Sequence, residues 1–240
     1  MGRIDNPDFP WESDAFRGEV ALLRERRPTT PRRVLLLGGY RAPYIPAMLV
    51  ARELRRFVTL PPDRLLISCY PFASSVRAAA EIASRALARR GWSGEELDVI
   101  GLSMGGIVGR LLLSREGGPR AARLFTLATP HRGSLLSERI RPDAAACDLR
   151  RGSEVLREVD AAFPKRRYEL TCYATLRDWW VGATRAAPEG MDPIWLDPHR
   201  PGGSLMAHFY INTDRRILAD LAMRLADGQG FARSGPPPRD

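Results

Sequence analysis

Residues 97–110, with the sequence LDVIGLSMGGIVGR, constrain the fold more than any other segment of the chain. An apolar run that favours a strand leads directly into Gly-x-Ser-x-Gly-Gly, and a helix-compatible run follows. This layout is typical of a nucleophile elbow, a tight strand-to-helix turn that holds a serine hydroxyl above the edge of a sheet. Gly101 and Gly105 flank Ser103 where the two backbones approach closely, so a Cβ atom there would clash. Ser103 is therefore the candidate nucleophile.

The Gly-x-Ser-x-Gly pattern is weakly diagnostic by itself. The chain holds 21 glycines in 240 residues, so the pattern arises by chance in roughly one such chain in ten. Its context makes it stronger, because apolar residues precede it and Ile107, Val108, Leu111 and Leu112 follow at helical spacing. The alternative is a turn that only packs tightly, with Ser103 as a helix cap.

Length and composition fit one globular domain with a substantial core, since 44% of the residues are hydrophobic and 27% are charged. No apolar run is long enough to span a bilayer, and the first residues lack the apolar segment of a signal peptide. Cys69, Cys147 and Cys172 are widely spaced, which argues against a disulfide framework and a cysteine-ligated zinc site. We expect a cytoplasmic protein without a metal or an organic cofactor.

The net charge of +9 raises the question of a nucleic-acid partner. Lys165 is the only lysine among the 37 basic residues, and the arginines are spread along the whole chain. A nucleic-acid-binding protein would show a basic patch with interleaved aromatic residues or a recognised module. We therefore expect no nucleic-acid partner, while weak attraction to an anionic membrane surface stays open.

Strands and helices alternate from residue 32 onward. The apolar runs predict strands over 34–37, 65–69, 97–102, 123–128, 168–175 and 193–196, and helices over 47–57, 74–90, 104–114 and 214–226. Strands that are apolar on both faces indicate the α/β class, with a mostly parallel sheet covered by helices on both faces. Four segments are predicted: an N-terminal accessory segment (1–30), the main domain (31–227), a short helical cap insertion within it (132–165) and a disordered tail (228–240).

The candidate chemistry gathers at one edge of this sheet. Ser103, Thr129, Asp178 and the turn at 38–39 each follow the end of a predicted strand. Because ligands of such sheets bind beyond the carboxyl ends of the strands, we expect these residues to share a site.

A serine nucleophile needs a base, and three histidines are candidates. In the α/β-hydrolase arrangement the chain order is serine, acid, histidine, with the histidine before the last helix, which favours His208. His199, among prolines and glycines, is the second candidate. His131 follows its strand too closely to be the late base, and we expect it to shape the floor of the site or to orient a loop.

The acid that orients the histidine is expected at Asp178, three residues after the strand predicted over 168–175. Asp192 and Asp197 are alternatives closer to the histidine in sequence. A solvated loop carboxylate is the competing interpretation of Asp178.

The oxyanion hole and the substrate pocket complete the predicted site. One oxyanion donor is expected to be the main-chain N–H of Met104, the residue after the nucleophile. The other is expected from Gly39 or Tyr40, in the turn after the strand at 34–37. Trp179 and Trp180 are candidates to line an acyl or alcohol pocket, although aromatic core packing explains them equally well.

The order of these motifs resembles the lipase/esterase branch of the α/β-hydrolase superfamily, in particular bacterial triacylglycerol-lipase-like and GPI-inositol-deacylase-like proteins. The matching segments are GLSMGGIVGR at 101–110, LATPHRGS at 127–134, DLRRGSEVL at 148–156, DWWV at 178–181 and HF at 208–209. The resemblance covers about residues 32–226. It implies a serine hydrolase that cleaves a carboxylic ester, of a small molecule or a lipid, through an acyl-serine intermediate and without a cofactor.

Three departures from the family pattern concern the site. Gly38-Gly39 stands where the family has His-Gly, Leu102 stands before the serine in place of a histidine, and no proline follows 178–181. The second oxyanion donor is therefore expected to be placed differently. The same triad serves thioesterases and acyltransferases, and a non-catalytic hydrolase-like binding protein is the alternative outside enzymes.

Overall fold

The computed structural model describes residues 4–140, 142–198 and 206–238. Their strands form one sheet in the order β2-β1-β3-β4-β5-β6, and all neighbouring strands are parallel. The strands are β1 (Arg33–Leu37), β2 (Leu65–Ser68), β3 (Glu96–Leu102), β4 (Arg120–Leu127), β5 (Glu169–Thr175) and β6 (Ile194–Leu196). The predicted α/β class with a parallel sheet is confirmed.

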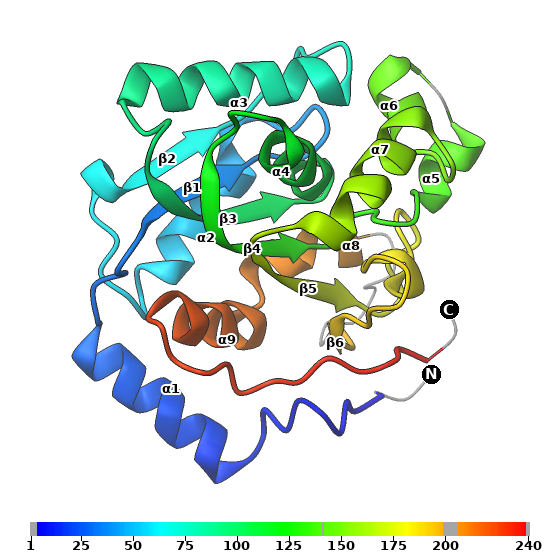
Figure 1. Ribbon diagram of the computed structural model, residues 1–240. Helices are drawn as coiled ribbons and strands as arrows, with labels where there is room; N and C mark the ends of the chain where they lie inside the picture. The colour runs from blue at the N-terminus through cyan, green and yellow to red at the C-terminus, as the bar shows by residue number, and fades with distance from the viewer. Residues whose placement is uncertain (1–3, 141, 199–205, 239–240) are drawn as a thin grey trace.

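Helices cover both faces of the sheet. In Figure 1, α3, α4 and α7 lie on one face, α2 and α9 lie on the other, and α1 lies outside α9. The longer helices are α1 (Asp14–Arg26), α2 (Tyr44–Leu54), α3 (Val76–Arg90), α4 (Met104–Ser114), α7 (Glu154–Ala162) and α9 (Arg215–Leu225), and the shorter ones are α5 (Leu135–Arg139), α6 (Ala144–Asp148) and α8 (Ala207–Tyr210). Within the described ranges, no helix combines the length and the apolar character that crossing a membrane requires.

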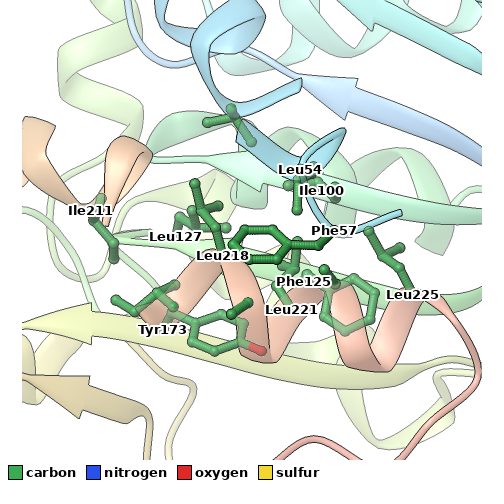
Figure 2. Close-up of a cluster of buried hydrophobic side chains, with 14 of the residues drawn as sticks. Leu54, Phe57, Ile100, Phe125, Leu127, Tyr173, Ile211, Leu218, Leu221 and Leu225 are labelled. Atoms are coloured by element: carbon green, nitrogen blue, oxygen red, sulfur yellow. The ribbon is translucent and has the colours of Figure 1, made fainter. Parts of the chain in front are cut away.

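The two faces of the sheet bury two separate cores. Alternate residues of β1 illustrate this, because Leu36 packs toward α2 and α9 whereas Leu35 packs toward α3 and α4. Figure 2 shows the first core, in which Phe57, Phe125 and Leu218 come from three distant parts of the chain. Burying one such side chain contributes about 1.5–3 kcal/mol, so these cores hold the sheet rigid beneath the site.

The carboxyl ends of the central strands lie level with one another. Leu37 at the end of β1 pairs with Gly101 of β3, and Leu102 at the end of β3 pairs with Leu127 at the end of β4. Helices α5 and α6 lie on the side toward which the strand arrows point (Figure 1). The residues that follow these strands therefore share one edge, as predicted.

The described part of the tail, residues 228–238, contacts the rest of the chain. Residues 228–238 run in an extended conformation beside the N-terminal segment (Figure 1), and Arg233 donates its main-chain N–H to the Asp8 carbonyl at 2.9 Å. Ala232 is buried, and its N–H donates to the carboxylate of Asp220 in α9 at 2.7 Å. The proline-rich composition of the tail indicates disorder. Nothing in the tail's own sequence indicates that the buried Asp220 carboxylate accepts one of its N–H groups.

Candidate active site

Ser103 lies in the turn between β3 and α4, in the strained conformation that an elbow requires. Its φ of 51° and ψ of −119° are unusual for a residue with a side chain. A Cβ atom on Gly101 would lie 2.5 Å from the Gly106 Cα, and one on Gly105 would lie 2.7 Å from the Gly38 carbonyl oxygen. The predicted close approach of strand and helix is confirmed.

Hydrogen bonds from the neighbouring strand hold this turn. The Ser103 N–H donates to the Leu127 carbonyl at 2.8 Å, and the Ser103 carbonyl accepts from the Thr129 hydroxyl at 2.8 Å. A strained residue costs about 1–3 kcal/mol, so surrounding contacts of this kind must offset it. The Ser103 hydroxyl remains available to a partner outside the turn.

That partner is His208. Its Nε2 lies 3.0 Å from the Ser103 Oγ, and its Nδ1 lies 2.9 Å from the Asp178 Oδ2. His208 stands at the start of α8, just before α9, and Asp178 stands in the loop that follows β5. Both are largely buried, with 7% and 3% of their surfaces exposed. The structure thus brings together the three residues that the sequence singles out.

The hydrogen-bond partners fix the tautomer of His208. An ionised carboxylate only accepts hydrogen bonds, so the Nδ1 facing Asp178 carries the proton and Nε2 is left to accept from the Ser103 hydroxyl. The other Asp178 oxygen, Oδ1, accepts from the main-chain N–H groups of Trp180 and Val181 at 3.0 and 3.2 Å. The carboxylate is therefore fixed in place, and the histidine is oriented to take a proton from the serine.

The two candidate tryptophans have different positions. Trp180 stacks on the His208 ring, with centroids 5.3 Å apart and planes 6° from parallel, and it lines the cavity beside Ser103. Trp179 contacts the Trp180 ring edge-on at 5.9 Å and is not among the residues that line this cavity. The structure brings only Trp180 to the candidate site.

An apolar cavity of about 140 Å³ opens beside Ser103 and His208. Its walls come from the start of α2, from the segment 134–149 and from α8. Helices α5 and α6 lie within the insertion that the sequence predicts as a cap. The apolar residues of its lining include Pro46, Ala47, Leu136, Ile140, Leu149 and Phe209.

The candidate oxyanion donors lie next to the nucleophile. Gly39, in the turn after β1, is close enough that a Cβ atom on it would lie 3.5 Å from the Ser103 Cβ, and Met104 is the first residue of α4. Within the described part of the chain, the N–H groups of Gly39, Tyr40 and Met104 donate to no protein acceptor. Gly38, by contrast, donates its N–H to the Ser68 carbonyl at 2.9 Å.

His131 lies in a separate, sealed cluster. It is fully buried, with Nδ1 3.3 Å from the Arg110 guanidinium and Nε2 3.0 Å from the Thr126 hydroxyl. Burial, together with the positive charges of Arg110 and Arg132, lowers the pKa of His131 well below its usual value. It does not line the cavity, so it forms no part of the floor of the site.

The remaining alternatives do not meet Ser103 or His208 in the described structure. Asp197 accepts from the Ile4 N–H and from the Arg177 guanidinium, both at 2.9 Å. Asp192 lines a different hollow. His199, the alternative base, lies outside the described residues.

The sequence did not indicate Asp143, which joins the candidate oxyanion turn to the opposite wall of the cavity. Its carboxylate accepts from the Tyr40 hydroxyl at 2.8 Å and caps α6 through the Ala146 N–H at 2.8 Å. The only local signal is an aspartate before three alanines, which indicates a helix cap and says nothing of a distant partner.

No family model matches the chain, and no curated protein matches it either. Solved structures do. The lipase BlEst2 from Bacillus licheniformis matches in its mature form with a TM-score of 0.58 and 14% identity, over 82% of this chain and 92% of that one. A lipase-esterase related protein from Clostridium acetobutylicum matches with a TM-score of 0.54 and 10% identity, over 82% and 95%.

Two longer proteins match over part of their length. The propeptide form of BlEst2 gives a TM-score of 0.59 at 14% identity over 87% of this chain, and the phospholipase PlaB from Legionella pneumophila gives 0.49 at 14% over 65%. This chain spans 53% of the first and 44% of the second. At identities of 10–14%, the matches with BlEst2 and the Clostridium protein show a shared architecture and nothing of function. Together with the six-stranded parallel sheet and its elbow, they show that the chain has the α/β-hydrolase fold.

Proposed function

We propose that this protein is a serine hydrolase that cleaves carboxylic esters, with Ser103 as nucleophile, His208 as general base and Asp178 as the group that orients it. The observation that carries the proposal is the chain of contacts from the Ser103 Oγ through His208 to Asp178, at 3.0 and 2.9 Å, beside an apolar cavity. Similar folds in solved lipases agree with it.

The first half of the reaction forms the acyl-serine. As the Ser103 Oγ attacks the ester carbonyl carbon, His208 Nε2 takes the hydroxyl proton, and Asp178 stabilises the imidazolium that results. The carbonyl oxygen becomes an oxyanion, which accepts hydrogen bonds from the N–H groups of Met104 and of the turn at 39–40. The tetrahedral intermediate then breaks its bond to the alcohol, which leaves with the proton from His208.

The second half releases the acid. A water molecule gives a proton to His208 Nε2 while its oxygen attacks the acyl carbon, and the same N–H groups hold the second oxyanion. Collapse of this intermediate returns the proton to the Ser103 Oγ and frees the carboxylic acid. The cycle consumes one water molecule and leaves the enzyme unchanged.

The walls of the cavity indicate the kind of acyl group. Pro46, Ala47, Leu136, Ile140 and Leu149 offer apolar contacts next to the nucleophile and no charged group. A short or medium apolar acyl chain gains about 0.8 kcal/mol per buried methylene in such a cavity. An esterase and a thioesterase differ in the group that leaves, an alcohol or a thiol, so a panel of esters and thioesters with equal acyl chains separates them. An acyltransferase differs in the acceptor, so an added alcohol that competes with water for the acyl-serine tests for transfer.

The first test is covalent labelling with a fluorophosphonate, with the adduct located by peptide mass spectrometry. The second test measures the hydrolysis of p-nitrophenyl esters. We expect labelling at Ser103, and we expect Ser103→Ala to lower turnover by at least about a thousandfold without unfolding the protein. Ser114→Ala is the matched control, because this serine lies at the end of the same helix and its hydroxyl donates to the Leu111 carbonyl at 3.0 Å, away from the cavity. A folded Ser103→Ala protein that hydrolyses esters normally, or a folded wild type that resists labelling, contradicts the proposal and favours a binding protein.

A further inference from the structure

Two walls of the cavity, far apart in sequence, are joined through a single carboxylate. Asp143 Oδ2 accepts from the Tyr40 hydroxyl at 2.8 Å and from the Arg41 Nε at 2.8 Å, and the Arg41 Nη2 lies 2.5 Å away. Tyr40 and Arg41 belong to the turn after β1, whereas Asp143 immediately precedes α6. The contact therefore links the turn that carries the second candidate oxyanion donor to the segment 134–149.

The other oxygen of Asp143 fixes the carboxylate itself. Oδ1 accepts from the Ala146 N–H at 2.8 Å, which makes Asp143 the N-cap of α6. This short helix is anchored in the core through Ala145, and Leu149 follows it in the same core. The position of Asp143 Oδ2 is therefore fixed by α6, and Tyr40 and Arg41, which donate to it, are held in a defined place.

The carboxylate remains charged across the working range of pH. Burial opposes ionisation, but hydrogen bonds from the Ala146 N–H, Tyr40 and Arg41 together lower the pKa of Asp143 below its usual value. The Asp143 side chain is 18% exposed, so the contact is partly screened from water. A hydrogen bond to a charged group is stronger than a neutral one, which suits a contact that must hold a loop.

The turn needs such support because its backbone is strained. Arg41 adopts a φ of 48°, in the left-handed region that disfavours residues with a side chain, and the turn begins with Gly38-Gly39. Glycines widen the range of conformations open to the chain. An oxyanion hole works only when its N–H groups already point at the place where charge will develop.

We propose that Asp143 is a positioning residue that holds Tyr40 and Arg41 so that the N–H groups at 39–40 point toward the oxyanion beside Ser103. This role rests on the proposed function, since it concerns the transition state of that reaction. Asp143 contributes no atom to the reacting groups and acts through the turn. It is distinct from Asp178, which orients the base.

Asp143→Asn weakens the contact with Tyr40 and Arg41 and keeps the cap of α6. Asparagine caps a helix as well as aspartate does, so the bond to the Ala146 N–H is kept, but its amide neither carries the charge nor accepts both turn donors. Asp214→Asn is the matched control: Asp214 caps α9, binds the Arg216 guanidinium and has a side chain that is 12% exposed. Both variants lose an arginine partner and keep a cap.

The kinetic measurement compares kcat, KM and the inhibition constant of a phenylboronic acid, which binds as a tetrahedral adduct. Removing a whole oxyanion donor costs about 10²–10³ in kcat. For a displaced turn we expect kcat about tenfold lower in Asp143→Asn, a similar weakening of boronate binding and little change in KM. Tyr40→Phe should lower kcat in the wild-type background and have no further effect in Asp143→Asn. If Asp143→Asn behaves as Asp214→Asn does, or raises only KM, the inference is wrong.

Hydrogen exchange tests the same contact without any reaction. The amides of residues 39–42 should exchange faster in Asp143→Asn than in the wild type and in Asp214→Asn, because the turn opens more often. Unchanged exchange contradicts the inference. Failure of the proposed function would appear differently, as a wild type that is folded but neither labelled nor active, and it would remove this role as well.

Discussion

His208 and His131 lie in polar clusters of similar composition but with opposite surroundings. The Nδ1 of His208 faces the Asp178 carboxylate, and its Nε2 faces a hydroxyl at the edge of a cavity. The Nδ1 of His131 faces the Arg110 guanidinium, and its Nε2 faces the Thr126 hydroxyl in a sealed interior. Each ring therefore meets one charged group and one hydroxyl through its two nitrogens, and the Cys172 sulfur also lies 3.5 Å from the Nε2 of His131. The presence of a charged residue and a hydroxyl beside a histidine does not by itself distinguish the two clusters.

The charged group beside Nδ1 determines which nitrogen of each ring carries the proton, and the two histidines therefore have opposite tautomers. A guanidinium only donates, so the Nδ1 of His131 accepts from Arg110 and the proton resides on Nε2, which donates to the Thr126 hydroxyl. In His208 the carboxylate reverses this, and Nε2 is free to accept a proton. Burial and Arg110 also hold the pKa of His131 low, so this ring stays neutral. A histidine serves as a base where a carboxylate faces Nδ1 and a cavity admits the substrate.

The second cluster instead joins elements of the fold. Arg110, in α4, is 1% exposed and donates to the Val159 carbonyl at 3.0 Å and to Asp160 at 2.8 Å. Its guanidinium also lies 4.9 Å from the centre of the Phe163 ring. His131 links this arginine to β4 through Thr126. The cluster stabilises the packing of α4, the helix that begins at the elbow, against α7 and the sheet.

The largest expected effect separates the two histidines directly. His208→Ala removes the proposed base, so turnover of a p-nitrophenyl ester should fall by about 10⁶-fold, with fluorophosphonate labelling lost and little change in Tm. His131→Ala should do the reverse: it leaves a buried guanidinium short of a partner and costs about 1–3 kcal/mol of stability, while kcat per folded molecule stays within a few-fold. A folded His131→Ala protein that cannot be labelled would break the comparison.

The acids of the two clusters give the next test. Asp178→Asn keeps the size of the side chain but presents an amide that favours the wrong tautomer of His208, so kcat should fall by roughly 10⁴-fold. Asp160→Asn, its counterpart beside Arg110, should lower the free energy of unfolding and leave kcat nearly unchanged. The two variants are compared by initial rates and by urea unfolding. Equal losses of activity would show that the clusters are not independent.

Much of this site could be predicted from the chain because its signals are local. The elbow follows from the pattern of glycines around Ser103, and a Cβ atom on Gly101 would meet Gly106, five residues away. The atoms that Gly105 must avoid belong to Leu37 and Gly38, which are distant in sequence, so here the pattern and not a local contact carries the prediction. The alternation of apolar strands and helices gives the sheet, although β4 begins at Arg120, three residues earlier than predicted. Asp178 is predicted from its place three residues after a strand and His208 from its place before the last helix, and the structure brings His208 to Ser103 and Asp178 to His208.

The features that could not be predicted depend on partners that are distant in sequence. Asp143 lies 103 residues from Tyr40, and nothing near it indicates that its second oxygen is used. The same holds for Ala232, whose anchor is the buried carboxylate of Asp220. Trp179 and Trp180 are neighbours of the same residue type, so the sequence does not distinguish them. The backbone conformation of the loop determines that Trp180, and not Trp179, stacks on His208.

The third prediction concerns the dependence of stability on pH. The pKa of His131 is well below its usual value of 6.5 in the folded protein, so below about pH 6.5 the unfolded chain binds a proton that the folded protein does not. This contribution to the free energy of unfolding is complete above pH 6.5 and is lost as the pH falls, by up to about 1.4 kcal/mol per pH unit. Urea unfolding at pH 7.5 and pH 5.0 measures it, and His131→Gln should reduce the difference between the two values. An equal difference in both proteins would mean that other groups carry it.

The smallest effect concerns the ring that lies against His208. In the proposed reaction this histidine becomes a cation, and an indole face within about 6 Å stabilises a cation by about 0.5–2 kcal/mol. The Trp180 ring lies in that position, 5.3 Å away and nearly parallel, so Trp180→Leu should lower kcat by about fivefold while KM reports any change in the cavity wall. Trp179→Leu is the matched control, because Trp179 contacts Trp180 edge-on and does not line the cavity. If both variants lower kcat equally, the effect comes from packing of the loop, and the indole face does not stabilise the charged base.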